Sequence, residues 1–195
     1  MTKKIAVFLD RDGTINKEGG YINHESRLEL MPNSSKGIKL FNENNILTVV
    51  CTNQAGVARG YFKENLIQVV NQRLQNLLKK EGAYLDDINY CPHHPTVGSP
   101  DYQKDCNCRK PKPGMIEKSA KKLDIDIKKS YVVGDKMSDV IWGHKMGTKS
   151  VMVMTGYGRG EYEYHRESWH DKPDYIAQDL LGAAKWIIKD IKKTL

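Results

Sequence analysis

Short apolar runs that alternate with helical patterns constrain this chain more than any other feature. Four of the runs are continuous, and two are weaker candidates. The continuous runs lie at 5–9, 46–51, 131–133 and 151–154, and the weaker ones at 88–91 and 175–177. Continuous apolar runs of this length predict strands that are covered on both faces, which are typical of parallel sheets.

Between the runs, apolar residues recur at spacings of three and four. This periodicity predicts helices over 66–78, 115–123 and 180–191, and Gly82 is suited to end the first. Strands that alternate with helices predict a Rossmann-like, doubly wound α/β fold with a mostly parallel sheet. A length of 195 residues suits one well-buried core, so we expect a single domain over 1–195.

The composition excludes several classes of protein. Hydrophobic residues are 39% and charged residues 28%, as in an ordinary globular protein. No stretch approaches the ~20 apolar residues of a membrane helix, and the run at 5–9 is too short for a signal-peptide core. We therefore expect a cytoplasmic protein with no membrane partner, and a monomer. The net charge of +7 comes from scattered residues, so nucleic acid is not expected as a partner.

Carboxylates and a hydroxyl follow three of the predicted strands. Asp10 and Asp12 come directly after the first run, Thr52 after the second, and Asp135 after the third. Parallel sheets bind ligands at the carboxyl ends of their strands. If these strands are neighbours, the four side chains converge there. Clustered carboxylates repel one another unless a cation neutralises them, and Mg²⁺ prefers oxygen ligands. The sequence therefore predicts a magnesium site at this edge.

A lysine near such a cluster would help to neutralise a phosphoryl group during transfer. Lys110 and Lys112 are available in the segment 109–114, where two prolines stiffen the chain. A lone Asp-x-Asp is common and means little. Followed by Gly-Thr, and combined with the pair Asp135 and Asp139 after another strand, it indicates phosphoryl chemistry.

The four cysteines predict two environments. Cys51 lies in an apolar run and is expected to be a buried core thiol. The other three form a Cys-x-His and a Cys-x-Cys pair, and three thiolates with one imidazole suit a closed tetrahedral zinc site. His94 is the alternative imidazole. A disulfide is less expected in a reducing compartment, where three cysteines would leave one over. The expected zinc ligands are Cys91, His93, Cys106 and Cys108.

Together the motifs resemble the haloacid dehalogenase-like phosphatases, in the right order over residues from about 5 to 155. The matching segments are Asp-Arg-Asp-Gly-Thr at 10–14, Thr-Asn-Gln at 52–54, the lysines near 110, and Gly-Asp-Lys-x-Ser-Asp at 134–139. The resemblance implies that hydrolysis proceeds through an aspartyl phosphate, a route that divides the reaction into two steps.

The resemblance also implies roles. Asp10 would be the nucleophile, and Asp12 would protonate the leaving alcohol and then take a proton from water. Magnesium would be held by the carboxylates of Asp10 and Asp135 and the backbone carbonyl of Asp12. Thr52 and Lys110 would bind the phosphoryl group. The preference for Lys110 over Lys112 comes from the resemblance alone. Asp139 would contact the metal-binding residues without binding the metal itself.

Segments 91–95, 106–113 and 52–61 resemble the zinc-loop branch of this family more closely. Segment 17–21 does so too, although Asn33 stands where a glycine is more usual after the proline. In this branch zinc is structural. Only 37 residues separate Thr14 from Thr52, too few for a separate cap domain. Expected substrate-binding residues are Gly19, Gly20, Tyr21, Asn53, Gln54, Arg109 and Lys136.

The surplus of charge near Arg109 and Lys136 fits a small phosphorylated sugar with a second anionic group. The branch implies removal of the 7-phosphate of D-glycero-D-manno-heptose 1,7-bisphosphate, with histidinol phosphate as the nearest alternative substrate. A polynucleotide end is a more distant one. A zinc-stapled nucleic-acid-binding module is the alternative without chemistry, but it leaves Asp10 and Asp12 unexplained. Arg59 could assist or be a surface residue.

One long stretch, 156–173, has no clear periodicity. It is rich in aromatic and charged residues, including Tyr157, Tyr162 and Trp169. It could edge the pocket or join subunits. We favour a packed surface loop whose aromatic residues anchor it.

Overall fold

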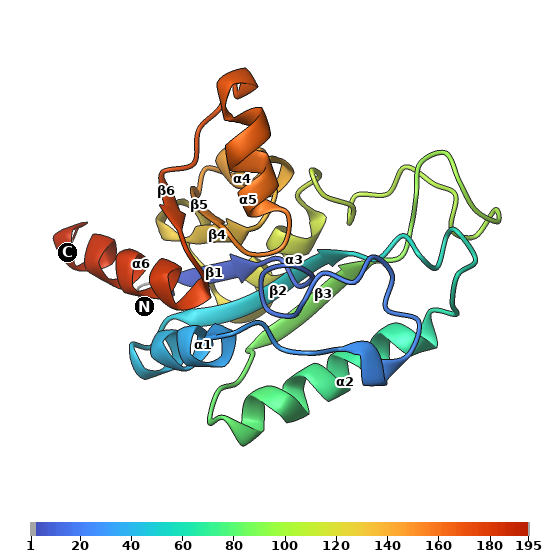
Figure 1. Cartoon of the computed structure of the whole chain (residues 1–195), viewed down its shortest axis with the longest axis horizontal. Coiled ribbons are helices and arrows are strands. Elements are labelled where there is room, and N and C mark those ends of the chain that lie inside the picture. The colour runs from blue at the N-terminus through green and yellow to red at the C-terminus, as the bar shows by residue number, and fades with distance from the viewer. Residues whose placement is uncertain (1–2, 195) are drawn as a thin grey trace.

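The computed structural model describes residues 3–194. Residues 1, 2 and 195 of the predicted domain 1–195 lie outside the described residues. The centre is a six-stranded parallel sheet in the order β3-β2-β1-β4-β5-β6 (Figure 1). All six predicted runs are strands. Their bounds are β1 Ala6–Leu9, β2 Leu47–Asn53, β3 Asp87–Cys91, β4 Tyr131–Gly134, β5 Lys149–Val153 and β6 Tyr175–Ala177.

Helices cover both faces of the sheet, so the predicted doubly wound fold is confirmed. In β1, Val7 and Leu9 pack into the core shared with α1, α2 and α6, whereas Ala6 and Phe8 face α3 and α4. The longer helices are α1 Ser34–Glu43, α2 Asn65–Lys80, α3 Gly114–Leu123, α4 Met137–Met146 and α6 Leu180–Thr194. Short helical segments are η1 Glu25–Arg27, η2 Ile127–Lys129, α5 Gly158–Gly160, η3 Glu161–His165 and η4 Arg166–Ser168.

Several helical regions have no counterpart among the helices predicted at 66–78, 115–123 and 180–191, among them α1, α4 and the turns between 158 and 168. The inward face of α4 includes Asp139 and Gly143 beside Val140 and Trp142, which interrupts an apolar pattern. The stretch 156–173, predicted as an irregular loop, instead forms the turns α5, η3 and η4 between 158 and 168. Gly158 is their only buried residue, so they lack the apolar face that creates a detectable periodicity.

The strand order reverses beside β1. The chain runs outward from β1 through β2 to β3 and then returns to β4 on the other side of β1. Leu9 is in register with Val50 of β2 and Val133 of β4, so the residues that follow these strands meet at one edge. Such a reversal is where open α/β sheets bind their ligands.

The described residues between β1 and β2 form only a loop, η1 and α1, so they provide no separate cap domain over this edge. The long connection from β3 to α3 begins at the same edge and extends outward from it, and its residues 94 and 109–111 line the cavity there (Figure 1). Over residues 3–194, none of the helices has the length and apolar character needed to cross a bilayer.

Candidate active site

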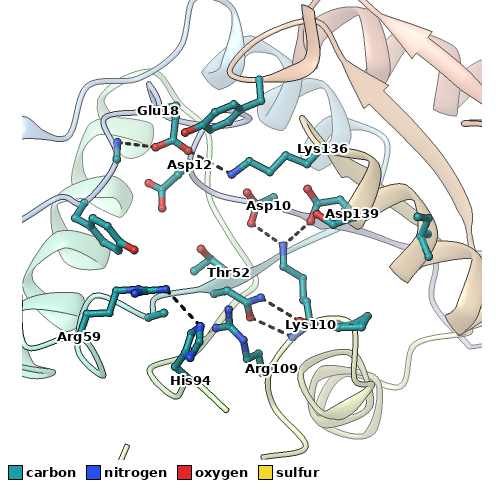
Figure 2. Close-up of a pocket in the computed structure, with 18 of the residues that line it drawn as sticks. Asp10, Asp12, Glu18, Thr52, Arg59, His94, Arg109, Lys110, Lys136 and Asp139 are labelled. Atoms are coloured by element: carbon teal, nitrogen blue, oxygen red, sulfur yellow. Dashed lines mark hydrogen bonds and ion pairs between the residues drawn. The ribbon is translucent and has the colours of Figure 1, made fainter. Parts of the chain in front are cut away.

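A buried lysine joins two carboxylates at the end of β1. Lys110 Nζ donates to Asp10 Oδ1 and to Asp139 Oδ1, each at 2.7 Å (Figure 2). The side chains of Lys110, Asp10 and Asp139 are 9%, 11% and 5% exposed. Burial alone would lower the pKa of Lys110, but the two carboxylates outweigh it and raise that pKa. Lys110 is therefore a fixed positive charge beside Asp10.

Asp135, at the end of β4, has an oxygen that lacks a partner. Its Oδ2 accepts from the backbone N–H of Tyr157 at 2.8 Å, whereas the buried Oδ1 has no hydrogen bond among the described residues. Two glycines make this close packing possible. A Cβ on Gly13 or Gly156 would lie 2.1 Å from Asp135 Oδ2, and both have positive φ, at 86° and 54°.

The electrostatics of this cluster fit a divalent cation. Burial and then the charge of Asp10 raise the pKa of Asp135 to about 7. Burial likewise raises the pKa of Asp10 to about 6, although Lys110 opposes it. Carboxylate oxygens of Asp10, Asp135 and Asp139 lie within 4.8 Å of one another. Together with the orphaned Asp135 oxygen, this all-oxygen donor set suits Mg²⁺.

Asp12 is held in place by a buried arginine. The Arg11 guanidinium, in a residue only 1% exposed, donates to both oxygens of Asp12, from Nη2 to Oδ2 at 2.9 Å and from Nε to Oδ1 at 3.1 Å. Asn16 and Gln54 donate to it at 2.8 and 2.7 Å. Burial would raise the pKa of Asp12, but Arg11 and these hydrogen bonds lower it. Asp12 is thus an ionised carboxylate in a fixed orientation.

The residues after β2 position their neighbours. The Thr52 hydroxyl, buried at the floor of the cavity, accepts from Gln54 Nε2 at 3.0 Å. The Asn53 amide brackets the backbone of Lys110, since it accepts from the Lys110 N–H at 3.1 Å and donates to its carbonyl at 3.2 Å. Lys112 instead pairs with Asp105 at 2.5 Å, away from Asp10.

These groups open into a cavity of about 580 Å³. Gly20, Tyr21, Arg109 and Lys136 line it, as the sequence predicts for substrate-binding residues. The Lys136 ammonium lies 3.6 Å from a Glu18 oxygen and 4.2 Å above the ring of Tyr157. Gly19 and Gln54, also predicted to bind substrate, are not among the lining residues.

A second cluster contains the cysteines. The Sγ atoms of Cys91 and Cys106 lie 3.4 Å apart, those of Cys106 and Cys108 3.2 Å apart, and His93 Nδ1 is 3.3 Å from the Cys108 sulfur. A tetrahedron with Zn–S bonds of about 2.3 Å has edges of about 3.8 Å, so these spacings are close to what zinc requires. His93, and not His94, completes the group.

Known proteins with similar sequences decide the family. The chain is 44% identical over 160 residues to the D-glycero-alpha-D-manno-heptose-1,7-bisphosphate 7-phosphatase of Photorhabdus laumondii, covering 81% of this chain and 87% of that protein. It is 40% identical to the D-glycero-beta-D-manno-heptose-1,7-bisphosphate 7-phosphatase of Pasteurella multocida, covering 89% and 97%. A family model described as HAD-hydrolase-like matches residues 107–183. The chain belongs to the haloacid dehalogenase-like phosphatases.

Solved structures of this family share the fold. A D,D-heptose 1,7-bisphosphate phosphatase from B. bronchiseptica, complexed with magnesium and phosphate, superposes with a TM-score of 0.82 at 27% identity, over 95% of this chain and 99% of that one. A putative HAD-like phosphatase from Mesorhizobium loti gives 0.81 at 32% identity, over 97% and 88%. The predicted haloacid dehalogenase-like fold is confirmed.

Within this haloacid dehalogenase-like phosphatase, the structure brings Asp10, Asp12, Thr52 and Lys110 to one cavity. Asp135 lies next to this group, with Gly13 and Gly156 packed against its carboxylate. The sequence did not indicate that Arg11 and Asn16 hold Asp12, or that Gln54 contacts Asp12 and Thr52. The available signal was an arginine directly between two carboxylates at the end of a buried strand, where an unpaired charge would be costly.

Proposed function

We propose that this phosphatase removes the 7-phosphate of D-glycero-D-manno-heptose 1,7-bisphosphate and requires Mg²⁺. The observation that carries the chemistry is the buried Lys110–Asp10 pair beside Asp135 at the reversal of strand order. The substrate follows from relatives at 40–44% identity that act on heptose 1,7-bisphosphates. One is named for the alpha anomer and the other for the beta anomer, so both anomers belong in the test.

Asp10 attacks phosphorus in the first step. A bond forms between its carboxylate oxygen and phosphorus, and the bond from phosphorus to the sugar oxygen breaks. Asp12 supplies the proton that the leaving oxygen needs. Its pKa is low in the free protein, but a phosphate dianion beside it disfavours the charged carboxylate and so favours a bound proton. Lys110 and the Thr52 hydroxyl stabilise the phosphoryl oxygens.

In the second step water attacks phosphorus and Asp12 accepts its proton. The bond from phosphorus to Asp10 breaks, and inorganic phosphate leaves. The fixed orientation of Asp12, through Arg11 and Asn16, favours this transfer because a general base must be positioned before the reaction. Asp10 and Asp135, with the backbone carbonyl of Asp12, would hold Mg²⁺, which supplies neutralising charge for the phosphoryl oxygens.

We propose that the cluster of Cys91, His93, Cys106 and Cys108 binds structural zinc. The spacing of its sulfur and nitrogen atoms supports this assignment. Arg109, whose Nη1 donates to the His93 carbonyl at 3.0 Å, links the cluster to the cavity wall. Metal analysis of protein purified without added zinc should give one zinc per chain, and its absence would remove the assignment.

The substrate is tested by phosphate release from both anomers of the heptose bisphosphate, from histidinol phosphate and from 3′-phosphorylated DNA, with and without Mg²⁺. We expect the highest kcat/KM for one heptose anomer and no turnover without Mg²⁺. A higher kcat/KM for histidinol phosphate than for the heptose bisphosphates would overturn the substrate assignment but not the proposed mechanism. Turnover that is unchanged after complete magnesium removal would contradict the metal requirement.

A further inference from the structure

The segment that follows β5 contacts both regions that supply the proposed magnesium ligands. Thr155, Gly156 and Tyr157 lead from β5 into α5 (Figure 1). They lie outside the sequence motifs that indicate phosphoryl chemistry, and none of them has a carboxylate. Their hydrogen bonds reach Gly13, directly after Asp12, and the carboxylate of Asp135. The segment therefore joins the loop after β1 to the end of β4 without supplying a metal ligand itself.

Thr155 fixes one side of Gly13. Its Oγ1 donates to the Gly13 carbonyl at 2.6 Å, while the Gly13 N–H donates to the carbonyl of Asn16 at 2.8 Å. The peptide bond between Asp12 and Gly13 is trans, so the Asp12 carbonyl points in the opposite direction from the Gly13 N–H. The backbone carbonyl proposed to hold Mg²⁺ thus has its direction set by the two hydrogen bonds of Gly13.

The same segment fixes Asp135. The backbone N–H of Tyr157 donates to Oδ2 at 2.8 Å, and the buried Oδ1 has no hydrogen bond among the described residues. Gly156 packs against this carboxylate and against Gly13, since a Cβ on Gly156 would overlap Asp135 Oδ2 and lie 2.6 Å from the Gly13 Cα. Asp135 therefore cannot turn toward Gly156, and Oδ1 is the oxygen left for a cation.

The segment is itself held by the sheet. The Met154 N–H donates to the carbonyl of Ala177 in β6 at 2.8 Å, and the Gly158 N–H donates to the Thr155 carbonyl at 2.8 Å. Gly158 is buried, and a Cβ there would overlap the carbonyl oxygen of Val153 at the end of β5. Backbone packing therefore places the Thr155 hydroxyl and the Tyr157 N–H beside their acceptors.

We propose that Thr155 is a positioning residue for the magnesium site, which holds the Asp12 carbonyl through Gly13 while Tyr157 holds Asp135. This inference rests on the magnesium requirement of the proposed function. Groups that orient metal ligands without touching the metal typically change metal affinity by about ten- to a hundredfold when they are removed. Thr155 does not line the cavity, so its loss should act on the metal and not on contacts with the substrate.

The test measures metal binding to the protein without substrate. Mn²⁺ takes the same oxygen ligands as Mg²⁺. Electron paramagnetic resonance of free Mn²⁺ gives its Kd, and competition by Mg²⁺ identifies the site. Thr155→Val keeps the side-chain shape without the hydroxyl and should raise this Kd about tenfold, with kcat at saturating Mg²⁺ within about threefold of the wild type. A role in folding alone would lower the melting temperature without moving the Kd.

Two control variants isolate the hydroxyl. Thr155→Ser retains it and should bind Mn²⁺ as the wild type does. Thr148→Val, just before β5, removes a buried hydroxyl that has no hydrogen bond among the described residues, and should leave both Kd and kcat unchanged. An unchanged Kd for Thr155→Val, or an equal loss in Thr155→Ser, would overturn the proposal while the phosphatase function stands.

A second pair of variants tests the contact with Asp135. Gly156→Ala places a Cβ against Oδ2 at a φ of 54° and should abolish Mn²⁺ binding, whereas Gly160→Ala, with open space and a φ of −65°, should not change it. Unchanged binding by a folded Gly156→Ala would also overturn the proposal. If the wild-type protein bound no Mn²⁺ that Mg²⁺ displaces and turned over without Mg²⁺, the metal requirement would fail and the positioning role with it.

Discussion

The carboxylate–lysine cluster and the cysteine–histidine cluster are built in opposite ways. Asp10, Lys110 and Asp135 are far apart in sequence, and Asp10 and Asp135 are set by the ends of β1 and β4. The four zinc-ligand candidates lie within 91–108, where β3 ends and an irregular loop follows. The sheet positions the first cluster, whereas the second must hold its own loop together.

This difference predicts what each metal does. The first cluster already contains the Lys110 charge, which offsets two carboxylates in the folded protein. Its surroundings are core strands, so losing magnesium should cost turnover and little stability. The loop at 92–108 buries few apolar side chains, and a structural zinc contributes directly to folding. Losing zinc should therefore cost stability first and turnover second.

The sharpest test of this contrast is Asp10→Asn. We expect phosphate release to fall by at least ~10⁴-fold, because the amide is not a nucleophile. The melting temperature should stay within about 3 °C of the wild-type value, because the amide has the shape of the carboxylate and Lys110 retains its ion pair with Asp139. Asp101→Asn, on the exposed zinc loop, is the matched control and should leave turnover unchanged. Retained turnover of the Asp10 variant would contradict the nucleophile.

The next test concerns the two lysines of the proline segment. Lys110→Met should lower kcat by about 10²–10³-fold, because a fixed charge beside the phosphoryl group is lost. Lys112→Met should change kcat by less than about threefold, since Lys112 pairs with Asp105 outside the cavity. Steady-state kinetics on both variants decide the matter. A larger loss for Lys112 would show that the segment binds substrate in another arrangement.

Disrupting the cysteine–histidine cluster should lower stability more than turnover, which is the opposite of the expectation for Asp10→Asn. For Cys106→Ser we expect loss of zinc and a melting temperature lower by about 5–10 °C, or about 2–3 kcal/mol. Phosphate release should fall by less than about tenfold, because the reacting groups are positioned by the ends of β1, β2 and β4. Calorimetry, metal analysis and kinetics measure the three effects. If the variant lost zinc but kept the wild-type melting temperature, the proposal that zinc stabilises this loop would be refuted.

The smallest expected effect lies outside both clusters, on α4. His144 contacts Asp171 at 2.8 Å and Asp174 at 2.9 Å. Burial would lower the pKa of His144, but the two carboxylates raise it above its usual value of about 6.5. The stabilisation is therefore complete below about pH 6.5 and is lost as the pH rises through the raised pKa.

The corresponding variant is His144→Ala. Its melting temperature should fall further below that of the wild type at pH 6 than at pH 9, by a few degrees at most because the pair is partly exposed. His165→Ala, at an exposed position, should show no such difference. An equal deficit at both pH values would mean that His144 acts through packing rather than charge. Turnover should not change, because His144 lies outside both clusters and outside the cavity lining.

Much of the site was predictable because a parallel sheet brings strand ends together. Asp10 and Asp135 could be placed side by side from the apolar runs that precede them, and the strand register bears out the reason. The clustering of the three cysteines with His93 could be predicted from residue type and local spacing. The hydrogen bonds from Arg11 to Asp12 could not be predicted, because the side chains of adjacent residues meet only when the turn and their rotamers direct them toward each other.

The sequence alone determined the alternation of strand and helix, the carboxylates at the strand ends and the cysteine–histidine set, because each is a short-range pattern. Only the tertiary structure decided that Lys110 rather than Lys112 reaches Asp10, and that Gly13 and Gly156 close on Asp135. It alone brought Arg59 to His94. Those contacts join segments far apart in the chain, and their geometry depends on how loops pack at the sheet edge, which no local pattern encodes.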